Sequence, residues 1–166
     1  DLVRTTTGDA WVSLSSGAGF TAPTVWGSGL GTSGTEIHVT DVNADGKSDL
    51  VRFAPDGSAT AWISNGAAFA APVSRGSGFG TDPSRVRLAE LNGDGYEDAI
   101  LFQTDGNSYV FLGGAGGYAA AVLWGTGHGT DMSALQIADF NGDNKGDVIL
   151  FLVDGRSFVW LSAGTT

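Results

Sequence analysis

The chain has 166 residues, of which 42% are hydrophobic, and this length suits one ordinary domain with a single core. It has no cysteine, which excludes disulfides and thiolate-bound zinc, and no apolar run approaches the roughly 20 residues that cross a bilayer, so we expect no membrane insertion. A net charge of −10 with only eight Lys and Arg residues argues against a nucleic-acid partner.

The chain opens with a strand that recurs later. Asp1-Leu-Val-Arg4 aligns with Asp49-Leu-Val-Arg52, where the same residues begin an apolar segment. Asp1 therefore takes the place of the last residue of an acidic loop. The alignment indicates that the chain enters a repeating unit in its middle.

The first strand of each later unit is predicted by alternating apolar and polar residues. The three segments are Ile37–Val39, Val86–Leu88 and Leu135–Ile137. A period of two residues favours strands over helices.

A nine-residue acidic loop follows each of these strands. The copies begin at Asp41, Glu90 and Asp139, a constant spacing of 49 residues. Oxygen side chains at positions 1, 3, 5 and 9, together with the carbonyl of position 7, are the ligands that Ca²⁺ prefers. About three calcium sites are therefore predicted, with these ligands: Asp41, Asn43, Asp45, Lys47 and Asp49; Glu90, Asn92, Asp94, Tyr96 and Asp98; Asp139, Asn141, Asp143, Lys145 and Asp147.

The loop is not an EF-hand, which needs a bidentate Glu at position 12 and a following helix. Gly46, Gly95 and Asn144 at position 6 suit a residue with positive φ. The alternative to a metal site is a polar turn in which Asp and Asn side chains cap their own backbone. Without the bidentate Glu we expect a dissociation constant of roughly 10⁻⁴ to 10⁻³ M, typical of extracellular modules, so a secreted, extracellular location is predicted.

Three more strands are expected after each loop. The second strand is predicted at Leu50–Phe53, Ala99–Phe102 and Val148–Phe151. Asp-Gly dipeptides at 56–57, 105–106 and 154–155 then predict type I′ hairpins. The third strand is predicted at Ala61–Ile63, Val110–Leu112 and Val159–Leu161, and a weaker fourth strand at Ala71–Val73 and Ala120–Leu123.

Four short antiparallel strands in a repeat of this length predict the blades of a β-propeller, and hence an all-β fold. The chain is expected to be a single propeller segment with repeats 1–36 (partial), 37–85, 86–134 and 135–166 (partial). This is about 3.5 blades, or fourteen strands, so the ring is incomplete. Two arrangements stay open: a compact four-bladed molecule, or part of a longer ring completed by another chain or by further sequence of the same chain.

A glycine-rich segment leads to each following repeat, and it is expected on the propeller face opposite the acidic loops. The copies run from Trp26 to Thr32, Arg75 to Thr81 and Trp124 to Thr130. Aromatic faces beside backbone amides can hold a sugar. The candidate ligand-binding residues are Trp26, Leu30, Arg75, Phe79, Trp124 and His128. The alternative is that these side chains only pack between blades, and His128 is expected to be exposed.

The acidic loop, the Asp-(apolar)₃ strand and the phrase Asn65-Gly-Ala-Ala-Phe69 resemble the FG-GAP or VCBS repeat of integrin α-subunit propellers and secreted bacterial proteins. The order of elements and the Phe79-Gly80 phrase more narrowly resemble PVL-type fungal propeller lectins. The resemblance implies a propeller that binds a glycan, of N-acetylglucosamine or sialylated type, or an extracellular protein.

Catalysis finds little support, because the sequence has no nucleophile elbow, metalloprotease helix or phosphate loop. A polysaccharide lyase-type propeller is the minority enzymatic alternative. The predicted function is a calcium-stabilised extracellular recognition module, lectin-like or adhesive. The alternative is a non-catalytic structural or targeting segment of a larger secreted enzyme or toxin.

Overall fold

The computed structural model describes residues 1–31 and 35–164, which form fourteen β-strands in four antiparallel sheets. Each sheet is called a blade and is numbered along the chain. Blade 1 contains β1 (Leu2–Thr6), β2 (Asp9–Ser13) and β3 (Thr24–Ser28). Blade 2 contains β4 (Glu36–Thr40), β5 (Asp49–Phe53), β6 (Ser58–Trp62) and β7 (Val73–Ser77).

Blade 3 contains β8 (Val86–Ala89), β9 (Asp98–Phe102), β10 (Ser108–Phe111) and β11 (Val122–Gly125). Blade 4 contains β12 (Leu135–Ala138), β13 (Asp147–Phe151) and β14 (Ser157–Trp160). Single turns of 3₁₀ helix, Pro83–Arg85 and Met132–Ala134, precede β8 and β12. The all-β fold and the expected order of strands are confirmed.

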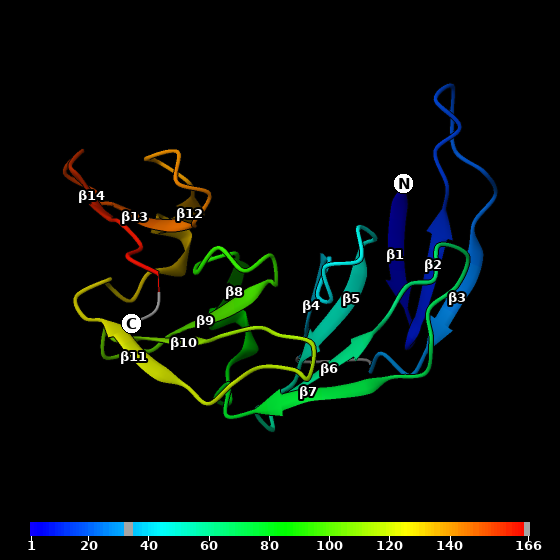
Figure 1. The fold of residues 1–166 in the computed structure, drawn as a ribbon, viewed down its shortest axis with the longest axis horizontal. Coiled ribbons are helices and arrows are strands. Elements are labelled where there is room, and N and C mark those ends of the chain that lie inside the picture. The colour runs from blue at the N-terminus through cyan, green and yellow to red at the C-terminus, as the bar shows by residue number, and fades with distance from the viewer. Residues whose placement is uncertain (32–34, 165–166) are drawn as a thin grey trace.

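The four blades stand side by side along an open arc, from β1–β3 at one end to β12–β14 at the other (Figure 1). Within every blade, strands that follow each other in sequence are neighbours in the sheet. The two end blades do not meet, so the arc is not closed into a ring (Figure 1). No helix in the described ranges has the length and apolar character needed to cross a membrane.

The hairpin turns differ from the predicted type. At Asp56-Gly57 only the glycine has positive φ, 79°, and its N–H donates to the Ala54 carbonyl at 2.9 Å. The turn is therefore centred one residue earlier than expected, with Gly57 in the left-handed position that follows it. A two-residue turn with positive φ at both positions occurs in blade 1, at Thr7 and Gly8 (45° and 89°), and that turn has no Asp-Gly dipeptide.

The fourth strand lies later in the chain than predicted. It runs over Val73–Ser77 and Val122–Gly125 and includes the first residues of the glycine-rich segment. Trp26, Arg75 and Trp124 are therefore strand residues, not loop residues. A register shift in each pairing with the third strand leaves Trp26, Arg75 and Trp124 without a partner in the ladder. Thr32, at the end of the first segment, lies outside the described residues.

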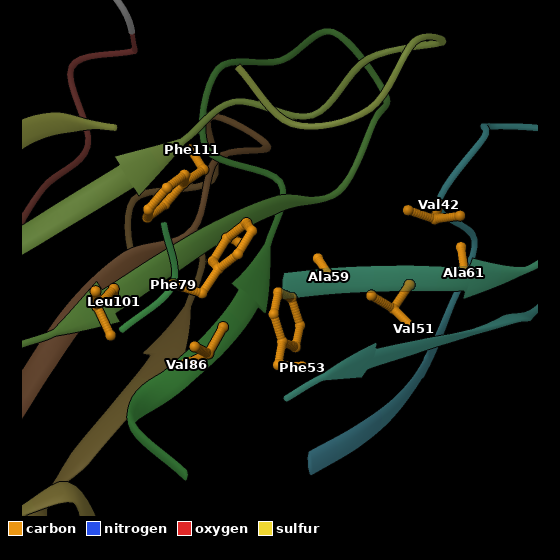
Figure 2. Close-up of a cluster of buried hydrophobic side chains, with 10 residues drawn as sticks. Val42, Val51, Phe53, Ala59, Ala61, Phe79, Val86, Leu101 and Phe111 are labelled. Carbon is orange, nitrogen blue, oxygen red and sulfur yellow. The ribbon is translucent and has the colours of Figure 1, made fainter. Parts of the chain in front are cut away.

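The core is built between blades, because facing sheets bury side chains against each other; blades 2 and 3 have a neighbour on both faces, and each end blade on one. Every residue of β9 is buried, whereas β1 and β13, in the end blades, each keep exposed positions. Figure 2 shows the cluster between blades 2 and 3, where the Phe79 ring lies 4.8 Å from that of Phe53 and 4.1 Å from that of Phe111. These interblade contacts position both the acidic loops and the glycine-rich segments.

Candidate metal loops and interblade cavity

The acidic loops connect the first and second strands of blades 2, 3 and 4, where the sequence places them. Each loop has positive φ at positions 4 and 6. The angles are 59° and 82° at Ala44 and Gly46, 84° and 86° at Gly93 and Gly95, and 79° and 65° at Gly142 and Asn144. The positive φ at position 6 was predicted from the sequence. The positive φ at position 4 was not predicted, because alanine at Ala44 does not indicate a left-handed residue.

The carboxylate at position 1 is surrounded by backbone amides of its own loop. Asp41 accepts from the N–H of Asp45 at 3.0 Å and of Gly46 at 2.7 Å. Glu90 accepts from three amides of its loop, so the longer side chain still reaches them. Asp139 makes the equivalent contacts. In this structure position 1 therefore organises the turn through the backbone amides of its own loop.

Positions 3 and 5 also accept loop amides. Asn43 Oδ1 accepts from Asp45 N at 3.1 Å, and Asp45 Oδ1 accepts from Lys47 N at 2.9 Å. The Lys47 ammonium lies 3.1 Å from Asp45 Oδ2, and its hydrogen bond lowers the pKa of the exposed Asp45 carboxyl. The loop that begins at Asp139 has the equivalent ion pair, between Lys145 and Asp143 at 3.3 Å. These lysines compete with a cation for position 5.

The carboxylate at position 9 has no solvent exposure in any of the three loops. Each of its oxygens accepts one backbone N–H, one from position 2 of the loop and one from the second residue after the third strand. The donors are Val42 and Ser64 for Asp49 (3.3 and 2.7 Å), Leu91 and Gly113 for Asp98 (3.0 and 2.6 Å), and Phe140 and Ser162 for Asp147 (2.9 and 2.8 Å). Asp1 accepts from Ser15 N at 2.7 Å in the same way. The sequence did not predict this anchoring role.

Burial leaves the position-9 charge poorly compensated. It raises the pKa of the Asp98 carboxyl to about 6 and also raises that of Asp49. No ion pair found in residues 1–31 and 35–164 involves either carboxylate. A carboxylate oxygen that accepts one N–H keeps a second lone pair, so the anchoring contacts do not use all of its acceptor capacity.

The donor chemistry of the loops fits Ca²⁺, which takes carboxylate, amide and carbonyl oxygens. In the described part of the chain, however, no three Asp, Glu, His or Cys side chains already converge on a point that could hold a metal. The oxygens at positions 1, 3 and 5 would have to turn from the amides toward the ion. The side chains thus lie as the polar-turn alternative requires, while their chemistry suits calcium.

Three of the candidate sugar-binding residues lie at the hairpin end of the strands, opposite the acidic loops, whereas Arg75 reaches toward the acidic loop that begins at Asp41. Leu30, Phe79 and His128 each donate a backbone N–H to the carbonyl of the hairpin glycine of their own blade, at 2.9, 3.1 and 3.1 Å. All three side chains are buried between blades. His128, expected to be exposed, is only 4% exposed, because its ring packs 4.6 Å from the Trp160 ring of blade 4.

Arg75 is also buried, and its guanidinium joins two blades. It donates to the carbonyls of Val42, in acidic loop 1, and of Gly114, in blade 3, at 3.1 and 2.9 Å. Its guanidinium lies 5.6 Å from the Tyr118 ring. Packing therefore accounts for Arg75, and the half-buried Trp26 and Trp124 are the two candidates with accessible rings.

A cavity of about 690 Å³ between blades 3 and 4 was not predicted. Its walls include Trp124 and His128 from blade 3 and Trp160 and Ser162 from blade 4. The equivalent spaces at the other two junctions are occupied by Phe69 and Tyr118, which contact Trp26 and Arg75.

Comparisons with known proteins agree with this architecture. The family model of the FG-GAP-like repeat matches residues 41–101 and 90–150. No curated protein matches the chain in sequence. Among solved structures, a lectin of Agrocybe aegerita with specific recognition of non-reducing terminal N-acetylglucosamine matches with a TM-score of 0.78 and 26% identity, over 93% of this chain and 44% of the lectin chain.

Toxin structures match as well. The Tc holotoxin pore of Photorhabdus luminescens matches with a TM-score of 0.75 and 22% identity, over 95% of this chain and 8% of the toxin chain. The TcdB2–TccC3 complex matches with a TM-score of 0.66 and 26% identity, over 79% of this chain and 7% of that chain. The chain thus spans less than half the length of each structure it matches.

Proposed function

The chain belongs to the FG-GAP-like repeat family, and we propose that it works as a non-catalytic recognition module that binds carbohydrate. The observation that carries this proposal is its likeness, at 26% identity over 93% of its length, to a lectin specific for non-reducing terminal N-acetylglucosamine. Glycans that end in N-acetylglucosamine are therefore the first ligands to test.

The half-buried indole of Trp26 is the residue to probe, because an accessible aromatic face can stack on the apolar side of a sugar. A glycan array in millimolar Ca²⁺, followed by calorimetry with the best glycan, should show binding that Trp26→Ala weakens. Trp11→Ala, which changes another half-buried tryptophan of blade 1, is the matched control and should leave affinity unchanged. Absence of binding to every glycan would turn the proposal toward protein adhesion.

The three acidic loops are proposed to bind Ca²⁺ and to stabilise the blades in an extracellular, calcium-rich setting. The support is the oxygen donor set, repeated in three blades, and the buried negative charge at position 9. For a dissociation constant of about 10⁻⁴ to 10⁻³ M, 5 mM Ca²⁺ should stabilise the fold by about 1 to 2 kcal/mol per site.

Thermal melting in Ca²⁺ and in EDTA tests this proposal. Asp45→Ala should reduce the calcium-dependent rise in melting temperature. Asp56→Ala, which removes an exposed turn-capping carboxylate outside the loops, should not. Equal melting temperatures in Ca²⁺ and EDTA would count against all three sites.

A second candidate function is a structural or targeting segment of a larger toxin or secreted enzyme. The match to the TcdB2–TccC3 complex, at 26% identity, favours it. The ring would then be completed by further sequence of the same protein or by another chain. A catalytic domain encoded in the same reading frame would support this candidate, and native mass spectrometry of the full-length product would show whether a second chain is needed.

A further inference from the structure

The three acidic loops differ at position 7. The residue there is Lys47 in the loop of blade 2 and Lys145 in the loop of blade 4, and each ammonium pairs with the position-5 carboxylate of its own loop, at 3.1 and 3.3 Å. In the loop of blade 3 the residue is Tyr96. Among residues 1–31 and 35–164, Asp94, at position 5 of that loop, forms no ion pair. Two loops thus hold a positive charge on an oxygen that a cation would need, and the third does not.

A second position of the repeat follows the same division. Residues 66, 115 and 164 are spaced by 49 and lie in the segment after the third strand. A Cβ at Gly66 would be 3.7 Å from Lys47 Cδ, and a Cβ at Gly164 would be 3.4 Å from Lys145 Cε. Ala115 takes this place in blade 3. The lysine stems therefore lie against glycine in two blades, and blade 3 has neither the lysine nor the glycine at these positions.

The loop of blade 3 also contains one carboxylate more than the others. Position 8 is Glu97 there, and Ser48 and Gly146 in the other two loops. Glu97 Oε2 is buried and has no hydrogen-bond partner in the described part of the chain. Burial, together with the nearby charges of Glu90 and Asp41, raises the pKa of Glu97. The blade 3 loop thus has four carboxylates and no basic side chain, whereas each of the other loops has three carboxylates and one lysine.

These differences affect how tightly each loop holds a divalent cation, because calcium sites gain affinity with the number of charged ligands. An ammonium beside a bound cation repels it, and a lysine that moves away gives up its ion pair. Lys145 also passes near the blade 3 loop, with its Cε 3.9 Å from where a Cβ of Gly93 would lie, but its ammonium pairs with Asp143 of its own loop. Cation binding is therefore weakened chiefly in the loops of blades 2 and 4.

We propose that the three loops are unequal calcium sites, that the loop of blade 3 has the highest affinity, and that Tyr96 and Glu97 are the residues that determine this preference. In the loops of blades 2 and 4 the lysine ammonium supplies part of the positive charge that the carboxylates need. The order of filling rests on the proposed calcium binding of all three loops. Blade 3 takes part in the two largest interblade clusters among the described residues, so the first calcium ion stabilises the blade that both clusters share.

Nuclear magnetic resonance of the isotope-labelled chain can follow the three loops separately. The amides of Gly46 and Asn144, at position 6, donate to the carboxylate at position 1 at 2.7 and 2.9 Å, and the amide of Gly95 donates to Glu90. These carboxylates must turn toward the ion when calcium binds, so the three amide signals should shift. In a calcium titration at low salt, the midpoint for Gly95 should lie at least about fivefold below the midpoints for Gly46 and Asn144.

Exchange of the position-7 residues tests the cause of this difference. The double variant Tyr96→Lys/Ala115→Gly gives blade 3 the lysine and the glycine of its neighbours, and it should raise the Gly95 midpoint at least about threefold. Lys47→Met removes the ammonium but keeps an unbranched stem, and it should lower the Gly46 midpoint by a similar factor. The dispersed spectrum of each variant shows directly that it is folded.

Glu97→Gln tests the additional carboxylate. It should raise the Gly95 midpoint at least about twofold and leave the Asn144 midpoint unchanged. Arg156→Met is the matched control for charge, because it removes one positive charge and an exposed ion pair with Asp154, at 2.7 Å, outside the acidic loops. It should leave all three midpoints unchanged.

A shared midpoint for the three amides, a Gly95 midpoint above the other two, or an unchanged Gly46 midpoint in Lys47→Met would overturn the unequal sites and leave calcium binding itself intact. If none of the three amides shifts at about 20 mM calcium, well above the expected dissociation constants, calcium binding and the order of filling are both wrong. The two proposals can therefore be told apart in one titration.

Discussion

Gly113 allows a sharp test of how blade 3 is anchored. This residue follows β10, and its N–H donates to Asp98 Oδ1 at 2.6 Å. The equivalent residues of blades 2 and 4 are Ser64 and Ser162, so comparison of the repeats alone indicates that serine is acceptable. In the structure, a Cβ at Gly113 would collide with the backbone carbonyl of Glu97, which cannot move aside as a flexible side chain can.

The cost of Gly113→Ser follows from two contacts. Forcing an atom against fixed backbone costs about 1–3 kcal/mol, and weakening a hydrogen bond to a buried carboxylate costs about 1.5–3 kcal/mol. The two costs are not fully additive, because one small shift of the backbone relieves the collision and at the same time lengthens the hydrogen bond to Asp98. We therefore expect a loss of about 3 kcal/mol, which for a chain of this size lowers the melting temperature by about 6–12 °C.

Circular dichroism melting in EDTA measures this loss without a contribution from metal. Gly116→Ser is the matched control, because a Cβ there meets nothing within 4 Å and the residue does not have positive φ. The control should stay within about 0.5 kcal/mol of the parent. If Gly113→Ser has the same melting temperature as the parent and the control, the backbone at Glu97 can move to accept the new side chain, and the reasoning is refuted.

Three further substitutions test the interblade packing. Phe79→Ala should cost about 3–5 kcal/mol in urea unfolding, since it removes the central ring of the cluster between blades 2 and 3. Trp62→Phe should cost about 1–2 kcal/mol, since the indole N–H that donates to the Ser28 carbonyl of blade 1 at 2.9 Å is lost; a cost below 0.5 kcal/mol would contradict this. Burial lowers the pKa of His38 and of His128, so the folded state holds both rings neutral. The stability that these neutral rings contribute is present above pH 6.5 and falls as the pH is lowered toward their folded-state pKa values. The double variant His38→Gln/His128→Phe should therefore lose less stability than the parent protein between pH 7.5 and 5.5.

The repeat period and the strand pattern were enough to predict the fold. The first and second strands lie where alternation and apolar runs place them, because strands packed on both faces need those residues. The third strand overlaps its predicted range but begins two or three residues earlier, at Ser58, Ser108 and Ser157. The fourth strand was placed too early, because glycines interrupt its pattern. In the structure a register shift skips Arg75 and Trp124 and lets the strand continue to the glycine that follows each of them, and a pattern of side chains does not reveal such a shift.

The acidic loops show a different limit of sequence reasoning. Their oxygen-rich composition predicts a cation, but the same oxygens suit backbone amides, and composition does not separate the two roles. Asp98 illustrates this, since its position in the motif gives no sign that both oxygens hold amides from two separate segments. His128 was misjudged because local glycines suggest exposure, while its burial comes from Trp160, 32 residues later in the chain.

The interblade clusters also determine how the arc comes apart. Each cluster joins only adjacent blades, and among residues 1–31 and 35–164 the buried hydrophobic residues number four between blades 1 and 2, ten between blades 2 and 3, and seven between blades 3 and 4. Stability is then a sum of nearest-neighbour couplings, as in a linear array, and not the property of one indivisible core. We therefore expect thermal fraying to begin at blade 1, which has the smallest cluster among the described residues, and the central pair of blades to persist longest.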